Sequence, residues 1–262
     1  VAAGMMLAGV QKISRGRLAA QLQEARMALP SELGYVKGSV NEFIDRVEDR
    51  SSLLMMNGLD IEDGRAVEHF EFRHLTFQEF LTARAMVNGW HPKRRKKDTL
   101  VKVLAPHFRD ENWLEVIPLA AVLGGKETES LLQQLTAEVR SLGPVVWANQ
   151  RIDTRFLNLG QCLADEAAAR PEIIRAALAE LIHRGEVLQG TAFTAALARG
   201  RYGADFRVEA GKAFLARDAD FDNAGQALSH AVWWQTIEVE TGAGFVRATE
   251  QLTNLLTLPE QL

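Results

Sequence analysis

The chain has 262 residues, a formal net charge of −4, 47% hydrophobic residues and a single cysteine, Cys162. This length and composition suffice for one large domain or two small ones with a buried core. The mixed charges indicate neither a nucleic-acid footprint nor a membrane surface, one cysteine excludes an internal disulfide framework, and no apolar run reaches the roughly 18 residues of a membrane span. The chain opens in a helical pattern without a signal peptide, which predicts a cytoplasmic piece of a longer protein.

The first fifty residues predict three helices. Residues 5–29 have apolar positions at helical spacing with a break near Ser14 to Gly16, which predicts two short helices closed by Pro30. Residues 39–51 predict a third, amphipathic helix. Its apolar stripe consists of Val40, Phe43, Ile44 and Val47.

A β-hairpin is predicted next. Residues 52–56 (SLLMM) are short and apolar, residues 57–64 (NGLDIEDG) are rich in turn formers, and residues 69–72 (HFEF) alternate. We expect the two flanking segments to pair, with Leu53 and Phe72 buried and the connection exposed. Three small helices followed by a hairpin describe a winged-helix domain, which we place at residues 1–90.

A further helix is predicted directly after the hairpin, in TFQEFLTARAMV at residues 76–87. Thr76 and Glu79 have the S/T-x-x-E form of a capping box. In such a box the threonine side chain accepts from the N–H of Glu79, and the glutamate accepts from the N–H of Thr76. We therefore assign both residues a structural role in preference to a catalytic one.

His74 lies at the end of the predicted strand, in phase with Phe70 and Phe72. This alternation predicts that its side chain points to the same side of the strand as the two aromatic rings. By residue type alone, a histidine at this place is a packed or exposed residue at the edge of the core.

The segment from SSLLMM to FEFRHLTFQEFLTARAMV resembles the end of the winged-helix region in NACHT-type STAND NTPases, the group of NOD-like receptors and bacterial antiphage proteins. These proteins have an apolar strand, a polar wing, the pattern F-x-F-x-H and an aromatic helix that reads TFQEF. The matching residues are Phe70, Phe72, His74, Thr76, Phe77, Gln78, Glu79 and Phe80. KISRGRLAAQL at residues 12–22 is also similar to the first winged-helix helices of the family.

The resemblance implies that His74 contacts a phosphate of ADP held by a preceding nucleotide-binding domain, and so maintains the inactive form. A neutral imidazole donor or an imidazolium can form such a bond. The resemblance also implies that the full-length protein is an ATPase, with ADP or ATP and Mg as its cofactor. This chain has no G-x-x-x-x-G-K-[ST] motif, and LGGKETES at residues 123–130 predicts a helix start on the surface, so we expect the chain alone to bind no nucleotide.

Residues 91–262 predict a helical repeat region of the HEAT or armadillo kind. The basic run WHPKRRKK at residues 90–97 indicates a solvated linker rather than a nucleic-acid contact. The endings AALARG (195–200) and AFLARD (213–218) echo each other, as stacked helix pairs would. The predicted helices lie within residues 98–108, 111–125, 127–139, 152–169, 171–185, 191–200 and 207–216.

The repeat region is expected to have a core of eight apolar side chains, which are Trp113, Ile117, Leu135, Phe156, Leu163, Ile174, Leu178 and Leu181. Residues 233–246 predict a strand or loop, with Trp233 and Trp234 in packing roles. Cys162 is interpreted as a small apolar helix residue, and the six histidines lack metal-ligand spacing. The sequence thus predicts no catalytic residue and no metal site.

These observations predict the regulatory and ligand-sensing part of a STAND NTPase, which acts in signalling, antiviral defence or innate immunity. Its expected partners are an upstream nucleotide-binding domain, a protein trigger that binds the repeats, and further copies of itself on activation, without membrane or nucleic acid. One alternative is a DNA-binding winged-helix regulator with a helical effector domain, although its candidate recognition helix, 39–51, is acidic. Another is a stand-alone helical-repeat scaffold.

Overall fold

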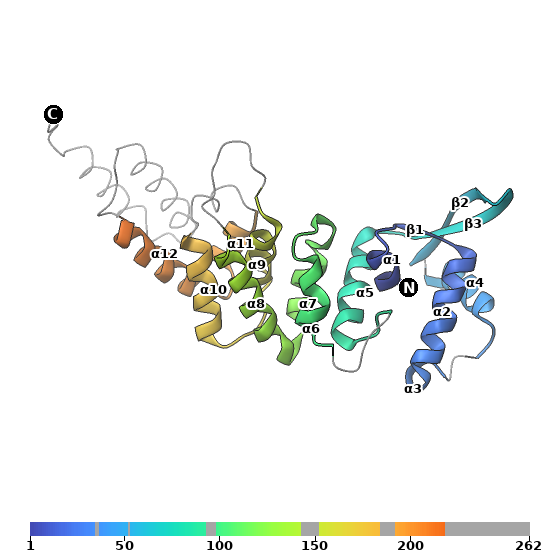
Figure 1. The fold of residues 1–262 in the computed structure, drawn as a ribbon, viewed down its shortest axis with the longest axis horizontal. Coiled ribbons are helices and arrows are strands. Elements are labelled where there is room, and N and C mark those ends of the chain that lie inside the picture. The colour runs from blue at the N-terminus through green and yellow to red at the C-terminus, as the bar shows by residue number, and fades with distance from the viewer. Residues whose placement is uncertain (35–36, 52, 93–97, 143–151, 184–191, 218–262) are drawn as a thin grey trace, which may run out of the picture. The chain divides into compact units, whose positions relative to one another are not determined.

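The structure, a computed structural model, describes residues 1–34, 37–51, 53–92, 98–142, 152–183 and 192–217. The predictions for residues 93–97 and 233–246, with Trp233 and Trp234, lie outside these residues. The chain packs as two compact units, Val1–Glu127 and Thr128–Leu262. The described residues are mainly helical and include one three-stranded antiparallel sheet, which confirms the predicted mainly α class with a small β element (Figure 1).

Of the described elements, the three strands and the first seven α-helices belong to the first unit. The helices are α1 (Ala2–Leu7), α2 (Arg15–Ala28), α3 (Pro30–Leu33), α4 (Val40–Ser51), α5 (Leu75–Asn88), α6 (Leu100–Leu104) and α7 (Val116–Leu123), with 3-10 turns at Ala105–His107, Glu111–Trp113 and Gly125–Glu127. The strands are β1 (Lys12–Ser14), β2 (Leu54–Glu62) and β3 (Arg65–Phe72). The hairpin of β2 and β3 extends away from the helices of this unit (Figure 1).

The break in the first helical segment differs from the prediction. It lies between α1 and α2, where β1 forms, so α2 already begins at Arg15. Helical periodicity missed β1 because a strand of three residues is too short to show alternation. Pro30 closes α2 as expected, and it also begins α3 at the first helical position.

The predicted hairpin forms, with β3 between β1 and β2 in the sheet. Leu54 pairs with Phe72 and Met56 with Phe70, which confirms the predicted pairing of the two segments. Phe72 is buried as expected, whereas Leu53 is only half-buried.

The segment predicted as a turn-rich connection, residues 57–64, is mostly strand. The register shifts between Met56 and Leu59, where Gly58 has a φ of +86°, and pairing then continues to Glu62. Only Asp63 and Gly64 form the turn, with φ angles of +49° and +74°. These angles are typical of the two-residue hairpin turn that an Asp-Gly pair favours, so the hairpin is longer than predicted.

The core of the first unit joins the sheet to the helices. Phe70 is fully buried at 0% exposure, and Leu18 of α2 and Ile44 of α4 belong to the same cluster. Arg15 binds Asp45 of α4 and Glu68 of β3 by ion pairs, which together with burial links α2 to both neighbours.

The second unit contains α8 (Thr128–Arg140), α9 (Thr154–Ala164), α10 (Pro171–His183), α11 (Ala192–Arg199) and α12 (Gly203–Arg217). The even-numbered helices α8, α10 and α12 pack against one another in series, while α9 packs on both α8 and α11. Figure 1 shows this succession of helices. Gly160 permits the close approach of α11, because a Cβ there would collide with the ring of Phe193.

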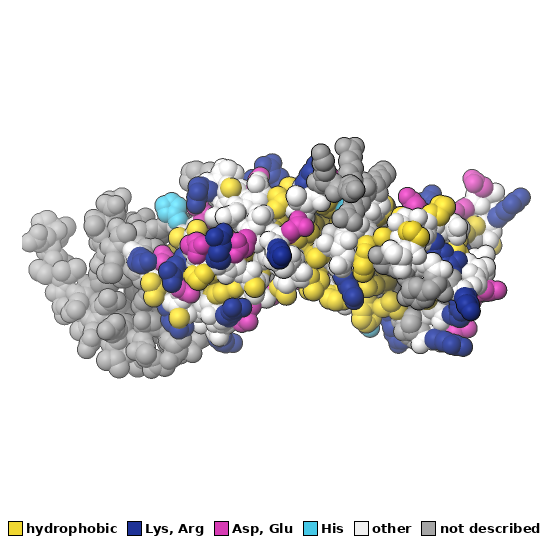
Figure 2. Space-filling model, turned by 90° about the horizontal axis from the view of Figure 1, so that it is seen from below, with side chains coloured by type: hydrophobic (Ala, Val, Ile, Leu, Met, Phe, Trp, Pro, Cys, Tyr) yellow, Lys and Arg dark blue, Asp and Glu magenta, His cyan; other side chains and the backbone are white. Residues whose placement is uncertain are grey.

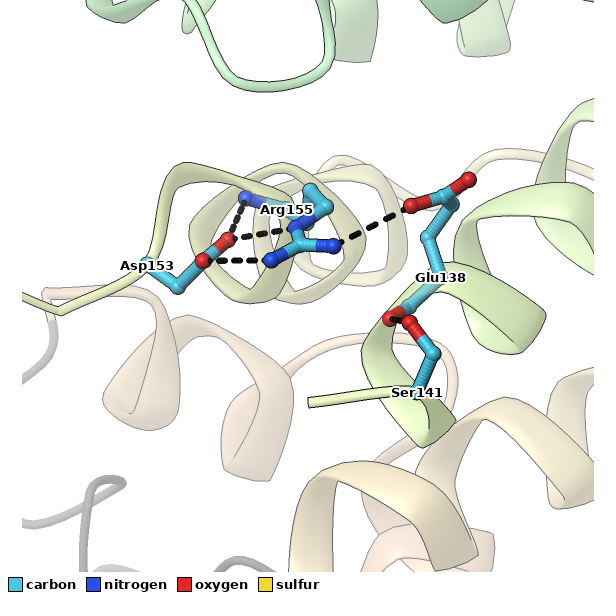
Figure 3. Close-up of polar contacts among 4 residues, drawn as sticks. All are labelled: Glu138, Ser141, Asp153 and Arg155. Atoms are coloured by element: carbon cyan, nitrogen blue, oxygen red, sulfur yellow. Dashed lines mark hydrogen bonds and ion pairs between the residues drawn. The ribbon is translucent and has the colours of Figure 1, made fainter. Parts of the chain in front are cut away.

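A buried arginine fixes the start of α9 (Figure 3). Asp153 precedes this helix, accepts from the N–H of Arg155 at 2.9 Å and pairs with its guanidinium at 2.8 Å. Glu138 of α8 reaches the same guanidinium at 3.2 Å. These carboxylates raise the pKa of Arg155, which stays charged and ties α8 to α9.

All eight predicted core side chains are buried, and none exceeds 2% exposure. They are Trp113, Ile117, Leu135, Phe156, Leu163, Ile174, Leu178 and Leu181. Trp113 and Ile117 belong to the first unit, because α6 and α7 pack on α5. The boundary between the compact units therefore lies after Glu127, whereas the predicted boundary lay at residue 90.

Candidate functional site

The candidate site is built around the junction of β3 and α5. The strand ends at Phe72, and His74 is the N-cap residue of α5 in an extended conformation, with φ −132° and ψ +139°. The predicted alternation therefore stops two residues before His74. Its side chain is exposed, whereas Phe70 and Phe72 are buried in the core.

The capping box predicted at Thr76 and Glu79 does not form. The helix begins at Leu75, so Thr76 lies inside its first turn, and no side chain caps the N-terminus. The physical reason is that Gln78 and Glu79 both lie on the buried face of α5, so the carboxylate points to the core. Glu79 keeps a structural role, but it is a buried carboxyl rather than a cap.

Three large apolar side chains near His74 are exposed to solvent. Leu75 is 45% exposed, Phe77 is 41% exposed and Phe80 is 40% exposed. The rings of His74 and Phe77 lie 5.7 Å apart at a tilt of 55°. We call His74, Phe77 and Phe80 the α5 patch, because their three-residue spacing places an exposed histidine and two exposed aromatic rings along one side of the helix.

The electrostatics of the α5 patch suit an anion. The first turn of α5 contains no acidic residue, and its N-cap residue His74 makes no side-chain capping bond, while the N–H of Phe77 donates to the carbonyl oxygen of His74 at 3.0 Å. The N–H groups of a helix's first turn have no partner within the helix, and the helix dipole adds positive potential there. Arg73 and His74 are exposed beside these groups, so the arrangement can bind a phosphate or carboxylate.

The opposite face of α5 is fastened to the unit. The side-chain amide of Gln78 donates to the carbonyl oxygen of Val10 at 3.2 Å, and the hydroxyl of Thr82 donates to the carbonyl of Gln78 at 2.6 Å. Burial, together with the nearby charge of Glu115, raises the pKa of Glu79. The patch is therefore held on a firmly packed helix.

A second polar cluster lies on the hairpin and was missed by sequence reasoning. His69 is buried, with its Nε2 atom 3.3 Å from a carboxylate oxygen of Glu62 and its Nδ1 atom 3.5 Å from one of Asp60. The Nδ1 atom also lies 3.2 Å from the carbonyl oxygen of Val67. The sequence does show that Asp60 and Glu62 alternate and therefore share one face of the strand. That they lie beside His69 depends on the register of β2 and β3, which only the structure supplies.

The first unit also has an apolar groove of about 520 Å³. Its lining residues include Leu18 and Leu22 of α2, Phe43 and Val47 of α4, and Leu81 of α5. Figure 2 shows hydrophobic side chains gathered on one face of the first unit. None of the described lining residues has a charged side chain, so the groove offers an apolar surface but no acidic or basic group for catalysis.

Other sequence candidates behave as packing or surface elements. Cys162 is fully buried in α9, and burial raises the pKa of its thiol far above the usual range. The segment LGGKETES runs from the end of α7 through a 3-10 turn to the start of α8, so it does not follow a strand. Within the described ranges, no group of His, Cys, Asp and Glu is arranged to hold a metal ion.

No helix in the part of the chain that the structure describes is long and apolar enough to cross a membrane. Comparisons of the chain with protein-family models, with curated proteins and with solved structures found no match.

Proposed function

We propose that this chain is the regulatory and ligand-sensing part of a STAND NTPase that acts in cytoplasmic signalling or antiviral defence. In this proposal the first unit contains a winged-helix domain, which docks on an upstream nucleotide-binding domain through the α5 patch. His74 then donates a hydrogen bond to a phosphate of bound ADP and favours the inactive form. ATP with Mg replaces ADP on activation.

The exposure of His74 on the uncapped N-terminus of α5 carries the proposal. A histidine that only packed at the edge of the core would be covered by its neighbours, whereas His74 and the surrounding Leu75, Phe77 and Phe80 all face solvent. Exposed apolar clusters mark surfaces that contact another protein or domain. The same surface offers an imidazole for a phosphate, together with the N–H groups of Leu75 and Thr76, which precede the bonded N–H of Phe77.

The order of elements in the first unit supports a winged-helix domain. Helices α1, α2 and α4 precede the long hairpin, and β1 pairs with β3 from the opposite side. α4, the candidate recognition helix of a DNA-binding domain, exposes Glu42, Asp45 and Asp49. This acidic surface disfavours phosphate contacts, so the DNA-binding alternative gains no support.

The second unit supports the sensing role. Alternate helices that pack in series are typical of helical repeats, which create extended surfaces for protein ligands. A protein trigger that binds better to the open form than to the closed form would shift the population toward the open form. Self-association would follow, as the resemblance to STAND NTPases implies.

The test is ADP binding by His74→Ala in a longer form of the protein that includes the nucleotide-binding domain. Loss of one hydrogen bond to a charged phosphate should weaken ADP binding by about 1–3 kcal/mol and raise signalling without the trigger. ADP affinity is measured by calorimetry, and basal signalling by the activity of the full protein.

Two control variants separate the contributions to ADP binding. His74→Gln retains a donor and should lose less affinity for ADP, while Thr76→Ala in the same helical turn should bind ADP like the parent protein. Equal ADP affinity and silent basal signalling in His74→Ala would contradict the proposal, because the histidine would then be a surface residue without a nucleotide contact.

A further inference from the structure

The strand β2 forms one edge of the sheet, because the strand order is β1-β3-β2. Its sequence, LMMNGLDIE, contains no lysine, arginine or proline, which are residues that natural proteins use to block pairing along edge strands. The irregularity between Met56 and Leu59 bends the strand, but the register from Leu59 to Glu62 is continuous. The outer part of β2 therefore remains a regular edge that another strand can reach.

The register shows which main-chain groups of this edge face outward. The two-residue turn makes Glu62 and Arg65 the first hydrogen-bonded pair of the hairpin. Bonded and non-bonded pairs alternate along antiparallel strands, so the N–H and C=O groups of Leu59 and Ile61 point away from β3. Each of these two residues thus offers one donor and one acceptor to an incoming strand.

The side chains along the same edge are apolar and solvent-exposed. Ile61 is 80% exposed, Leu59 is 63% exposed and Met56 is 44% exposed. Leu59 and Ile61 are two residues apart, so they lie on one face of the strand. An added strand would cover part of this face and remove apolar surface from water.

The opposite face of the edge carries the carboxylates of Asp60 and Glu62, and Arg65 of β3, which pairs with Glu62 across the hairpin, is the exposed base beside them. The side chains of Asp60 and Glu62 are 66% and 43% exposed, and Asp63 is exposed in the turn. His69 of β3 lies between Asp60 and Glu62. Like charges directly opposite each other destabilise a strand pair, so β2 of a second copy would be a poor partner. A strand with lysine or arginine at these positions would instead be attracted.

We propose that the edge of β2 at Leu59–Glu62 is a docking site for an extended segment of a partner protein, which alternates apolar residues with lysine or arginine. The segment adds a fourth strand to the sheet through the outward groups of Leu59 and Ile61. Its apolar side chains cover these two residues, and its basic side chains face Asp60 and Glu62. The inference goes beyond the proposed nucleotide switch and does not depend on it.

The experiment uses the full 262-residue chain and two short capped peptides. One peptide alternates valine with lysine, and the other alternates valine with glutamate. Binding is measured by fluorescence anisotropy, and amide hydrogen exchange at Leu59 and Ile61 is followed by NMR with and without peptide. The lysine peptide should bind, slow exchange at both amides and outcompete the glutamate peptide.

The matched variants are Ile61→Pro and Ala66→Pro, which alter residues that pair across the hairpin. Ile61→Pro removes an N–H from the proposed edge and should weaken binding of the lysine peptide at least ~10-fold, which corresponds to ~1.4 kcal/mol. Ala66→Pro removes an outward N–H on the other strand and should leave peptide binding unchanged. Ile61→Lys, which keeps the backbone and places a base on the edge, provides a second variant if the proline disrupts the hairpin.

Several results would overturn the proposal. These are absence of binding by the lysine peptide, equal binding of both peptides, or unchanged binding by both Ile61→Pro and Ile61→Lys. Dimerisation of the peptide-free chain that Ile61→Pro abolishes would identify a second copy as the occupant and would also overturn it. None of these measurements involves nucleotide, so failure here leaves the proposed role of His74 untouched.

Discussion

At the scale of single residues, the start of α5 places an exposed histidine close in sequence to two buried polar side chains. His74 is exposed, whereas Gln78 and Glu79 are buried at 3% and 8% exposure. Gln78 and Glu79 lie on the buried face of α5, whereas His74 is the extended N-cap residue that precedes the helix. The resemblance implies a contact role for His74, whereas Glu79 lies on a helix that packs against α1 and α7, with Glu115 as a nearby charge.

The first prediction concerns Glu79 and pH. Burial raises the pKa of Glu79 in the folded state, so the folded protein holds this proton more tightly than the unfolded chain does. The contribution to stability is present below the unfolded-state pKa and is lost as pH rises through the folded-state pKa. Glu79→Gln should therefore increase the unfolding free energy at neutral pH, on the order of 1 kcal/mol.

The measurement is urea unfolding of Glu79→Gln and the parent between mildly acidic and neutral pH. The difference in unfolding free energy should shrink as the pH falls, because the raised pKa favours protonation of the parent's Glu79 in the folded state. Asp49→Asn, an exposed change on α4, is the charge-matched control and should show little dependence. A destabilised Glu79→Gln variant at neutral pH would show that the carboxylate makes a favourable contact.

At the scale of elements, two S/T-x-x-E sequences precede helices, but only one forms a capping box. At α4 the N–H of Glu42 donates to the hydroxyl of Ser39 at 3.2 Å, and the N–H of Ser39 donates to the carboxylate of Glu42 at 2.9 Å. At α5 the helix starts before Thr76, because β3 leads almost directly into the helix. The capping box predicted at α5 was thus wrong, and the one at α4 is a finding of the structure that the sequence analysis did not predict.

The second prediction compares the two sequences. Ser39→Ala should lower the unfolding free energy by about 1 kcal/mol, because α4 loses the acceptor for one first-turn N–H. Thr76→Ala should change the unfolding free energy by much less, since Thr76 is exposed inside α5. Thermal and urea unfolding of both variants provide the measurement. An equal loss in the two variants would mean that Thr76 stabilises α5 in a way that the structure does not show.

At the scale of the whole molecule, the first compact unit includes more helices than the sequence assigned to it. The helices α6 and α7 have the same helical periodicity as those of the second unit, so periodicity alone cannot separate them. They pack on α5, and the carboxylate of Glu127 accepts from the N–H of Leu100 within the same unit. Tertiary contacts rather than a linker sequence set the boundary.

The third prediction tests this boundary with Trp113. Its side chain is 1% exposed and stacks on His107 with ring centres 3.8 Å apart. Trp113→Ala should cost about 3–5 kcal/mol, the usual cost of removing a large buried side chain. Amide hydrogen exchange should increase in the first unit, while α8 to α12 retain their protection. Uniform loss of protection in both units would contradict a boundary after Glu127.

The sequence alone predicted the longer helices, the presence of the hairpin and eight buried side chains, because these depend on local periodicity and turn chemistry. All eight predicted core side chains are buried, and Leu54, Met56, Phe70 and Phe72 pair as expected. Only the tertiary structure decided the short strand β1, the capping of α5, the surroundings of His69 and the unit boundary. Each of these depends on contacts between segments distant in the chain, whose register and packing a local pattern does not specify.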